Sequence, residues 1–78
     1  MTGQGMPLTM AAPGELLRVV GIRAGLGLQR RLADMGLTPG IQVRVINSQM
    51  AGPVLVEVRG SRVALGRGVA QKITVTGR

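Results

Sequence analysis

The chain has 78 residues, a length that allows one domain with a small hydrophobic core. It contains no cysteine and no histidine, which excludes disulfides, thiolate metal sites and histidine-based catalysis. Its formal net charge is +7, and nine of its ten basic residues are arginine, so the chain favours anionic partners.

The first segment, residues 1–7, is rich in glycine and polar residues and predicts a flexible tail, with one domain over 8–78. This segment has neither the basic start nor the apolar stretch of a signal peptide. No apolar run in the chain approaches the ~20 residues that a membrane span requires. We therefore expect a cytoplasmic protein that is not itself embedded in a membrane.

Beyond the tail, glycine and proline recur at short intervals and separate runs rich in Val, Leu and Ile. This pattern is typical of a small β-barrel or β-sandwich. We predict strands over 16–22, 41–48, 54–59, 62–66 and 72–76.

One segment, at about 26–36, has helical spacing instead. Leu28, Leu32 and Met35 fall at positions i, i+4 and i+7, which places them on one face of a helix. The pair Gly36-Leu37 is predicted to end this helix, with the glycine in the left-handed conformation and the leucine packing back.

Two Pro-Gly pairs introduce similar sequences, at Pro13-Gly14 and Pro39-Gly40. Proline followed by glycine suits the central positions of a type II turn. We interpret the similarity as one kind of turn used twice, because two units are too few for a solenoid.

The last hairpin is predicted to turn at Gly60-Ser61, in a two-residue type II′ turn. That turn places Val58 opposite Val63 and Val56 opposite Leu65. The same register makes Arg59 and Arg62 face each other across the hairpin tip, where like charges cost stability.

The preceding pair of strands is predicted to align Val45 with Val56, because this register keeps the apolar faces together. It sets Arg44 opposite Glu57 as a cross-strand ion pair. It also leaves Ile46 opposite Leu55 on the outer face.

The acidic residues, Glu15, Asp34 and Glu57, are scattered, and nothing in their spacing brings two together for acid–base chemistry. Ser48 and Ser61 have no histidine to activate them. Three scattered carboxylates also make a poor site for a hard cation. We predict a binding protein with no catalytic residues, no cofactor and no metal site, and not an enzyme.

Residues 31–40 read Arg-Leu-Ala-Asp-Met-Gly-Leu-Thr-Pro-Gly and resemble the Arg-Leu-x-x-Met-Gly-Leu-x-Pro-Gly signature of the FeoA family of ferrous iron transport proteins. Further matching pieces follow in order over residues 8–76. The resemblance implies a mainly β fold, a small SH3-like β-barrel of five to six strands with one main helix at about 26–36. It extends to the C-terminal SH3-like domain of DtxR-type metal-dependent regulators.

The resemblance also implies a function: a small cytosolic accessory protein of bacterial Fe(II) uptake that binds and modulates the FeoB membrane GTPase transporter. We expect Arg31, Met35 and Leu37, at the end of the helix, to contact this partner, together with Arg67. A metal-binding role, which the family label carries, finds no support in a chain without His and Cys.

Two alternatives remain open at this point. One is an SH3-like module that binds RNA or the ribosome, motivated by the charge of +7, although the absence of Phe, Tyr and Trp removes any stacking platform, so nucleic acid is not the expected partner. The other is a stand-alone relative of the SH3-like domain of DtxR-type regulators. A weak homo-oligomer is also left open.

Overall fold

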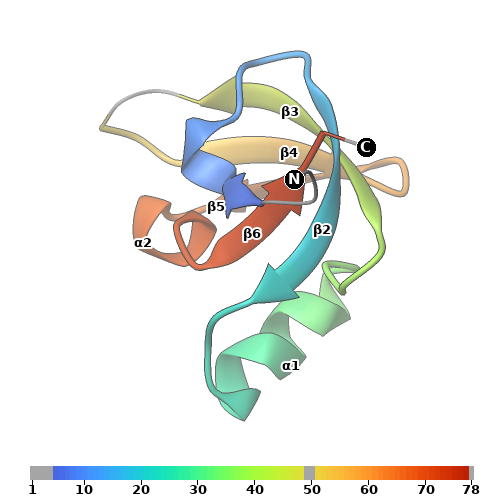
Figure 1. Cartoon of the computed structure of the whole chain (residues 1–78), viewed down its shortest axis with the longest axis vertical. Helices are drawn as coiled ribbons and strands as arrows, with labels where there is room; N and C mark the ends of the chain where they lie inside the picture. The colour runs from blue at the N-terminus through green and yellow to red at the C-terminus, as the bar shows by residue number, and fades with distance from the viewer. Residues whose placement is uncertain (1–4, 49–50, 78) are drawn as a thin grey trace.

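The computed structural model describes residues 5–48 and 51–77 (Figure 1). These residues contain six strands, two short α-helices and one 3-10 turn. The elements run in the order β1 (Met6–Pro7), η1 (Leu8–Met10), β2 (Leu16–Ile22), α1 (Leu26–Asp34), β3 (Gln42–Ser48), β4 (Val54–Val58), β5 (Ser61–Leu65), α2 (Arg67–Ala70) and β6 (Ile73–Thr76).

The strands form one antiparallel sheet in the order β1-β6-β2-β3-β4-β5. The sheet curls strongly, as Figure 1 shows, and within the described residues β1 and β5 remain its two edges. The predicted mainly β, SH3-like architecture is confirmed, with a barrel that backbone pairing leaves open. Met6 pairs with Val75, so the sheet begins inside the segment expected to be a tail; residues 1–4 of that segment lie outside the described part.

The strands form where the sequence alternates. In β4 the side chains of Val54, Val56 and Val58 are buried, while the two residues between them are half-buried. An alternation of period two places one set of side chains on the inner face of a curled sheet. The core that results is entirely apolar and consists of Leu8, Ala11, Leu17, Val19, Leu32, Leu37, Val43, Val45, Val54, Val56, Val58, Leu65, Ala70, Ile73 and Val75.

The register of β3 against β4 is confirmed at its centre, where Val45 lies opposite Val56 and Arg44 opposite Glu57. Beyond Val45 the register shifts by one residue, and Asn47 rather than Ile46 lies opposite Leu55. The predicted Ile46–Leu55 pair is therefore wrong. A β-bulge at this point inserts one extra residue into β3 and bends the strand.

The β4–β5 hairpin differs from its predicted register by two residues. Val58 pairs with Ser61, Glu57 with Arg62 and Val56 with Val63, so the turn is Arg59-Gly60 rather than Gly60-Ser61. Both turn residues have positive φ, 53° at Arg59 and 83° at Gly60, as a type I′ turn requires. A shift of two residues keeps the same side chains on the inner face, but Arg59 and Arg62 no longer face each other.

The two Pro-Gly turns occupy equivalent places in the sheet. Gly14 and Gly40 have φ of 88° and 94°, and in each turn the N–H of the residue after the glycine donates to the carbonyl of the residue before the proline. The Gly14 N–H donates to the Val45 carbonyl at 2.6 Å, and the Gly40 N–H donates to the Val19 carbonyl at 2.7 Å. Strands β2 and β3 are thus related by a local pseudo-twofold axis, and the predicted reuse of one turn type is confirmed.

The second helix, α2, was not predicted from the sequence. It is a single turn that begins after Gly66, and it buries Ala70 in the core. A four-residue helix carries too few positions to show a helical period.

Candidate partner-binding surface

Helix α1 stands at one end of the sheet, beyond the end of β2 (Figure 1). Leu32 is its one fully buried side chain and anchors the helix to the core, with half-buried Leu28 beside it. The Gln29 Nε2 donates to the Ala24 carbonyl at 2.7 Å and ties the first turn to the preceding loop. The remaining faces of the helix are open to solvent, so α1 presents its polar side as an accessible ridge.

The helix ends as the sequence predicts. Gly36 adopts a φ of 91°, its N–H donates to the Ala33 carbonyl, and the Leu37 N–H donates to the Leu32 carbonyl at 2.9 Å. These two hydrogen bonds define a Schellman motif, which satisfies the last carbonyls of the helix. The side chain of Leu37 is fully buried. Leu37 is therefore a core residue that shapes the end of α1, and it does not lie on a surface that a partner could contact.

Arg31 and Met35 keep the exposure expected of contact residues. They are four residues apart, so they lie on the same face of α1, and Met35 is 41% exposed although it is apolar. The structure thus brings together two of the four residues expected to contact a partner.

Two further exposed residues, one at each end of α1, escaped the sequence analysis. Leu26, the first residue of α1, is 69% exposed. Arg59 lies beside the end of the helix, with its Cδ 3.6 Å from the place a Cβ would take on Gly36. The sequence already shows that Leu26 lies outside the apolar face of the helix. The position of Arg59 depends on the turn between β4 and β5, which the sequence analysis misplaced.

We use the name α1 surface for the exposed side chains on α1 and beside its end: Leu26, Arg30, Arg31, Met35 and Arg59. It combines two exposed apolar side chains with three cations. Apolar side chains in a cationic setting suit a partner that is apolar with an acidic rim.

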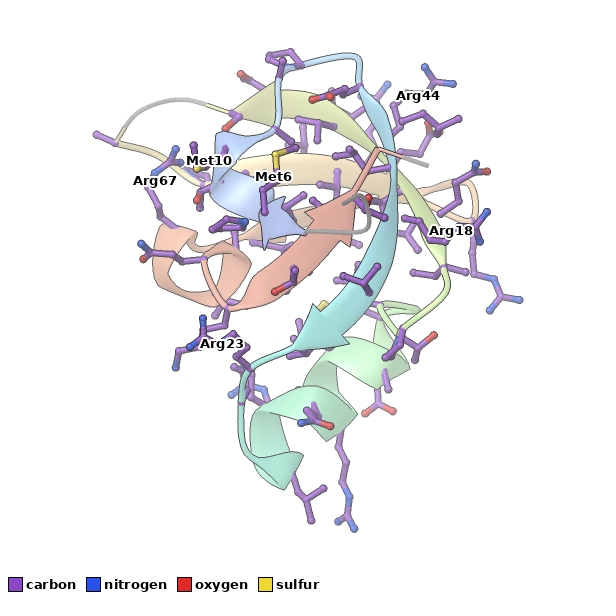
Figure 2. All side chains as sticks on the ribbon, in the orientation of Figure 1. Met6, Met10, Arg18, Arg23, Arg44 and Arg67 are labelled. Carbon is purple, nitrogen blue, oxygen red and sulfur yellow. The ribbon has the colours of Figure 1, made fainter. Side chains whose placement is uncertain are left out.

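Arg67 lies apart from this surface. It begins α2, and Figure 2 shows it on the side of α2 that faces away from α1. Its side chain is half-buried, and Nη1 donates to the Gly52 carbonyl at 3.2 Å. This bond ties α2 to the turn before β4, which gives Arg67 a structural role in the described chain.

Two further observations concern metals and membranes. Across residues 5–48 and 51–77, no three His, Cys, Asp or Glu side chains are grouped so that they could hold a metal ion. Within the same residues, no helix has the length and apolar character needed to cross a membrane.

Comparison with known proteins gives matches that cover nearly the whole domain. The FeoA domain model matches residues 6–77. A relative from Methanocaldococcus jannaschii, named "Putative Fe(2+) transport protein A", is 45% identical over 69 residues, which are 88% of this chain and 83% of the relative.

Solved structures agree with that match. The crystal structure of an iron uptake regulatory protein (FeoA) is 38% identical, with a TM-score of 0.86 over 91% of this chain and 95% of that one. A manganese-dependent transcriptional repressor is 26% identical with a TM-score of 0.88; all of this chain matches 44% of the repressor. The domain match, the relative and the shared fold together show that this chain belongs to the FeoA family.

Proposed function

We propose that this protein is an accessory component of Fe(II) uptake that binds the cytosolic part of a FeoB-type membrane GTPase transporter through its α1 surface. The observation that carries the proposal is the FeoA match over residues 6–77, which leaves no room for a second domain within the matched segment. In this proposal the protein sets the transporter's activity by contact and performs no chemistry of its own.

The α1 surface supports the proposal through its exposure. Leu26, at the start of α1, and Met35, at its end, are large apolar side chains in contact with water, and their burial against a partner would be favourable. Arg31 lies on the same face of α1 as Met35, Arg59 lies beside the end of the helix, and both guanidinium groups can form bidentate bonds with carboxylates of a partner.

The test is a binding titration between the protein and the purified cytosolic GTPase domain of the transporter encoded in the same organism. Met35→Gln and Arg31→Glu are expected to weaken binding about tenfold or more, since residues at the centre of an interface carry most of its affinity. Both side chains are exposed, so circular dichroism should show an unchanged fold.

Matched controls come from the rest of the chain. Met10 is 71% exposed and lies on η1, near α2 rather than α1 (Figure 2), so Met10→Gln repeats the chemistry of Met35→Gln elsewhere. Arg18 is exposed on β2, so Arg18→Glu repeats the charge reversal on the sheet. Equal loss of affinity in the controls and the α1 variants would reject the α1 surface, and no binding by the unmodified protein would reject the proposed function.

The alternative of a metal-responsive domain is favoured by one observation, the similarity to a manganese-dependent repressor over the whole chain. Calorimetry with Mn(II) and Fe(II) separates the two roles. Saturable binding at micromolar metal would favour the metal-responsive role, and its absence together with transporter binding would favour the accessory role.

A further inference from the structure

Arg23 and Lys72 lie side by side although 48 residues separate them in the sequence. β2 and β6 pair up to Ile22 and Ile73, and one more bond follows, from the Arg23 N–H to the Lys72 carbonyl at 2.8 Å. The register of the sheet therefore sets the two cations opposite each other. Like charges directly opposite on neighbouring strands destabilise a sheet.

The same two residues line a hollow of about 300 Å³ together with Gly68 and Gln71. It opens between α2 and the segment that leads into α1, where Figure 2 shows Arg23. A side chain added at Gly68 would meet no atom within 4 Å, so the glycine leaves open space on its side. The lining offers the guanidinium of Arg23, the ammonium of Lys72 and the amide of Gln71 as hydrogen-bond donors.

The acidic residues of the chain are committed elsewhere. Glu15 accepts a hydrogen bond from the Ala12 N–H, Asp34 ends α1, and Glu57 lies on β4 between Arg44 and Arg62. Glu57 therefore lies between a second pair of cations, Arg44 and Arg62, on the outer face of β3 to β5. Within residues 5–48 and 51–77, no carboxylate lies between Arg23 and Lys72.

We propose that this hollow is a binding site for a phosphate group, held by Arg23, Lys72 and Gln71. The charge favours phosphate among oxyanions: a phosphate group carries about −1.5 to −2 at neutral pH and comes closer to balancing two cations than a carboxylate, which carries −1. Arginine can grip two phosphate oxygens at once, and lysine adds a point charge. The site does not use the α1 surface, and its test needs no transporter.

The experiment is a titration of the isotope-labelled full chain with sodium phosphate, followed by the backbone amide signals at constant ionic strength. Saturable shifts confined to Arg23, Gly68, Gln71 and Lys72 are expected. Arg23→Gln should weaken binding about tenfold or more, because it removes a charge-assisted contact. The matched control Arg30→Gln, which removes a cation from α1, should leave the affinity unchanged.

A second measurement separates a binding site from a general charge effect. In chloride buffer, Arg23→Gln should raise the melting temperature, because it removes the repulsion between opposed cations. In phosphate the unmodified protein should gain more stability than the variant. Gly68→Leu, which fills the hollow and keeps both charges, should lose the phosphate shifts while it remains folded.

A titration with adenosine monophosphate identifies the source of the phosphate. Tighter binding of adenosine monophosphate than of inorganic phosphate would assign the site to a phosphate ester, and the reverse order would assign it to the free ion. The proposal is overturned by acetate that binds as tightly as phosphate, by shifts that spread over all arginine segments without saturating, or by equal affinities in Arg23→Gln and Arg30→Gln.

Discussion

Leu37 belongs to the motif at residues 31–40 and was expected to contact a partner, but its burial assigns it to the core. Its neighbour Met35 is 41% exposed, while Leu37 is fully buried and its N–H closes the end of α1. The sequence predicts the Schellman geometry correctly because a glycine and a following apolar residue are its local signature. The sequence does not show whether a residue of the motif contacts a partner or packs in the core, because a motif can require a residue for either role.

Leu37→Gln tests that assignment. The amide would enter an apolar core that holds no buried polar group among the described residues, at a cost on the order of 3 kcal/mol. A chain this short has only a few kcal/mol in reserve, so most molecules should be unfolded. Urea unfolding followed by circular dichroism measures the loss, because the chain has no aromatic residue to report by fluorescence. Met35→Gln, two residues away, should change the free energy of unfolding by less than about 0.5 kcal/mol. A folded Leu37→Gln protein would contradict the burial.

At the level of elements, the strands from β2 onward were predictable, whereas β1 and the hairpin turn were not. Valine at every second position, 54, 56 and 58, locates β4 within a residue of its end. The turn was misplaced because glycine was taken as the first residue with positive φ, whereas Arg59 adopts that conformation at 53°. The cost of a left-handed arginine is offset by a register that puts Glu57 opposite Arg62. This compensation depends on the pairing with the neighbouring strand, so the sequence of the turn alone does not reveal it.

Arg59→Asn is expected to stabilise the β4–β5 hairpin. Asparagine tolerates the left-handed region better than arginine, and Asn-Gly is the preferred sequence of a type I′ turn. The free energy of unfolding should rise by about 0.5 to 1 kcal/mol in urea titrations. Arg62→Asn serves as the comparison, since it removes a residue opposite Glu57 without touching the turn and should not stabilise. A loss of stability in Arg59→Asn would place the turn at Gly60-Ser61 after all.

For the whole molecule, net charge is the dominant feature. The molecule measures 30 × 27 × 24 Å along its principal axes and carries a formal net charge of +7. The screening length is roughly 30 Å at 0.01 M salt and 8 Å at 0.15 M. At low salt every arginine therefore feels every other one across the molecule, and at physiological salt only neighbours do. Composition alone predicts this repulsion, but the sequence did not reveal that Arg23 and Lys72 are paired at one hollow, because their contact requires the β2–β6 register.

Sodium chloride should therefore stabilise the protein. Raising it from 0.01 to 0.15 M is expected to increase the free energy of unfolding by on the order of 1 kcal/mol, because screening relieves the repulsion of the compact state. Urea titrations at the two concentrations measure the change. The double variant Arg18→Gln, Arg30→Gln carries two fewer positive charges and should respond less to salt. An unchanged or reduced stability of the unmodified protein at the higher concentration would show that the cations do not repel one another in the folded state.

The hydrogen bonds that join each Pro-Gly turn to the opposite strand affect how the α1 surface can evolve. The Gly40 N–H to Val19 carbonyl bond joins β2, three residues before that strand ends at Ile22, to the turn that follows α1. Helix α1 is thus an excursion between two clamped ends. Mutations on its outer side can retune the choice of partner while the clamp isolates the sheet from them, so recognition and folding are free to change separately.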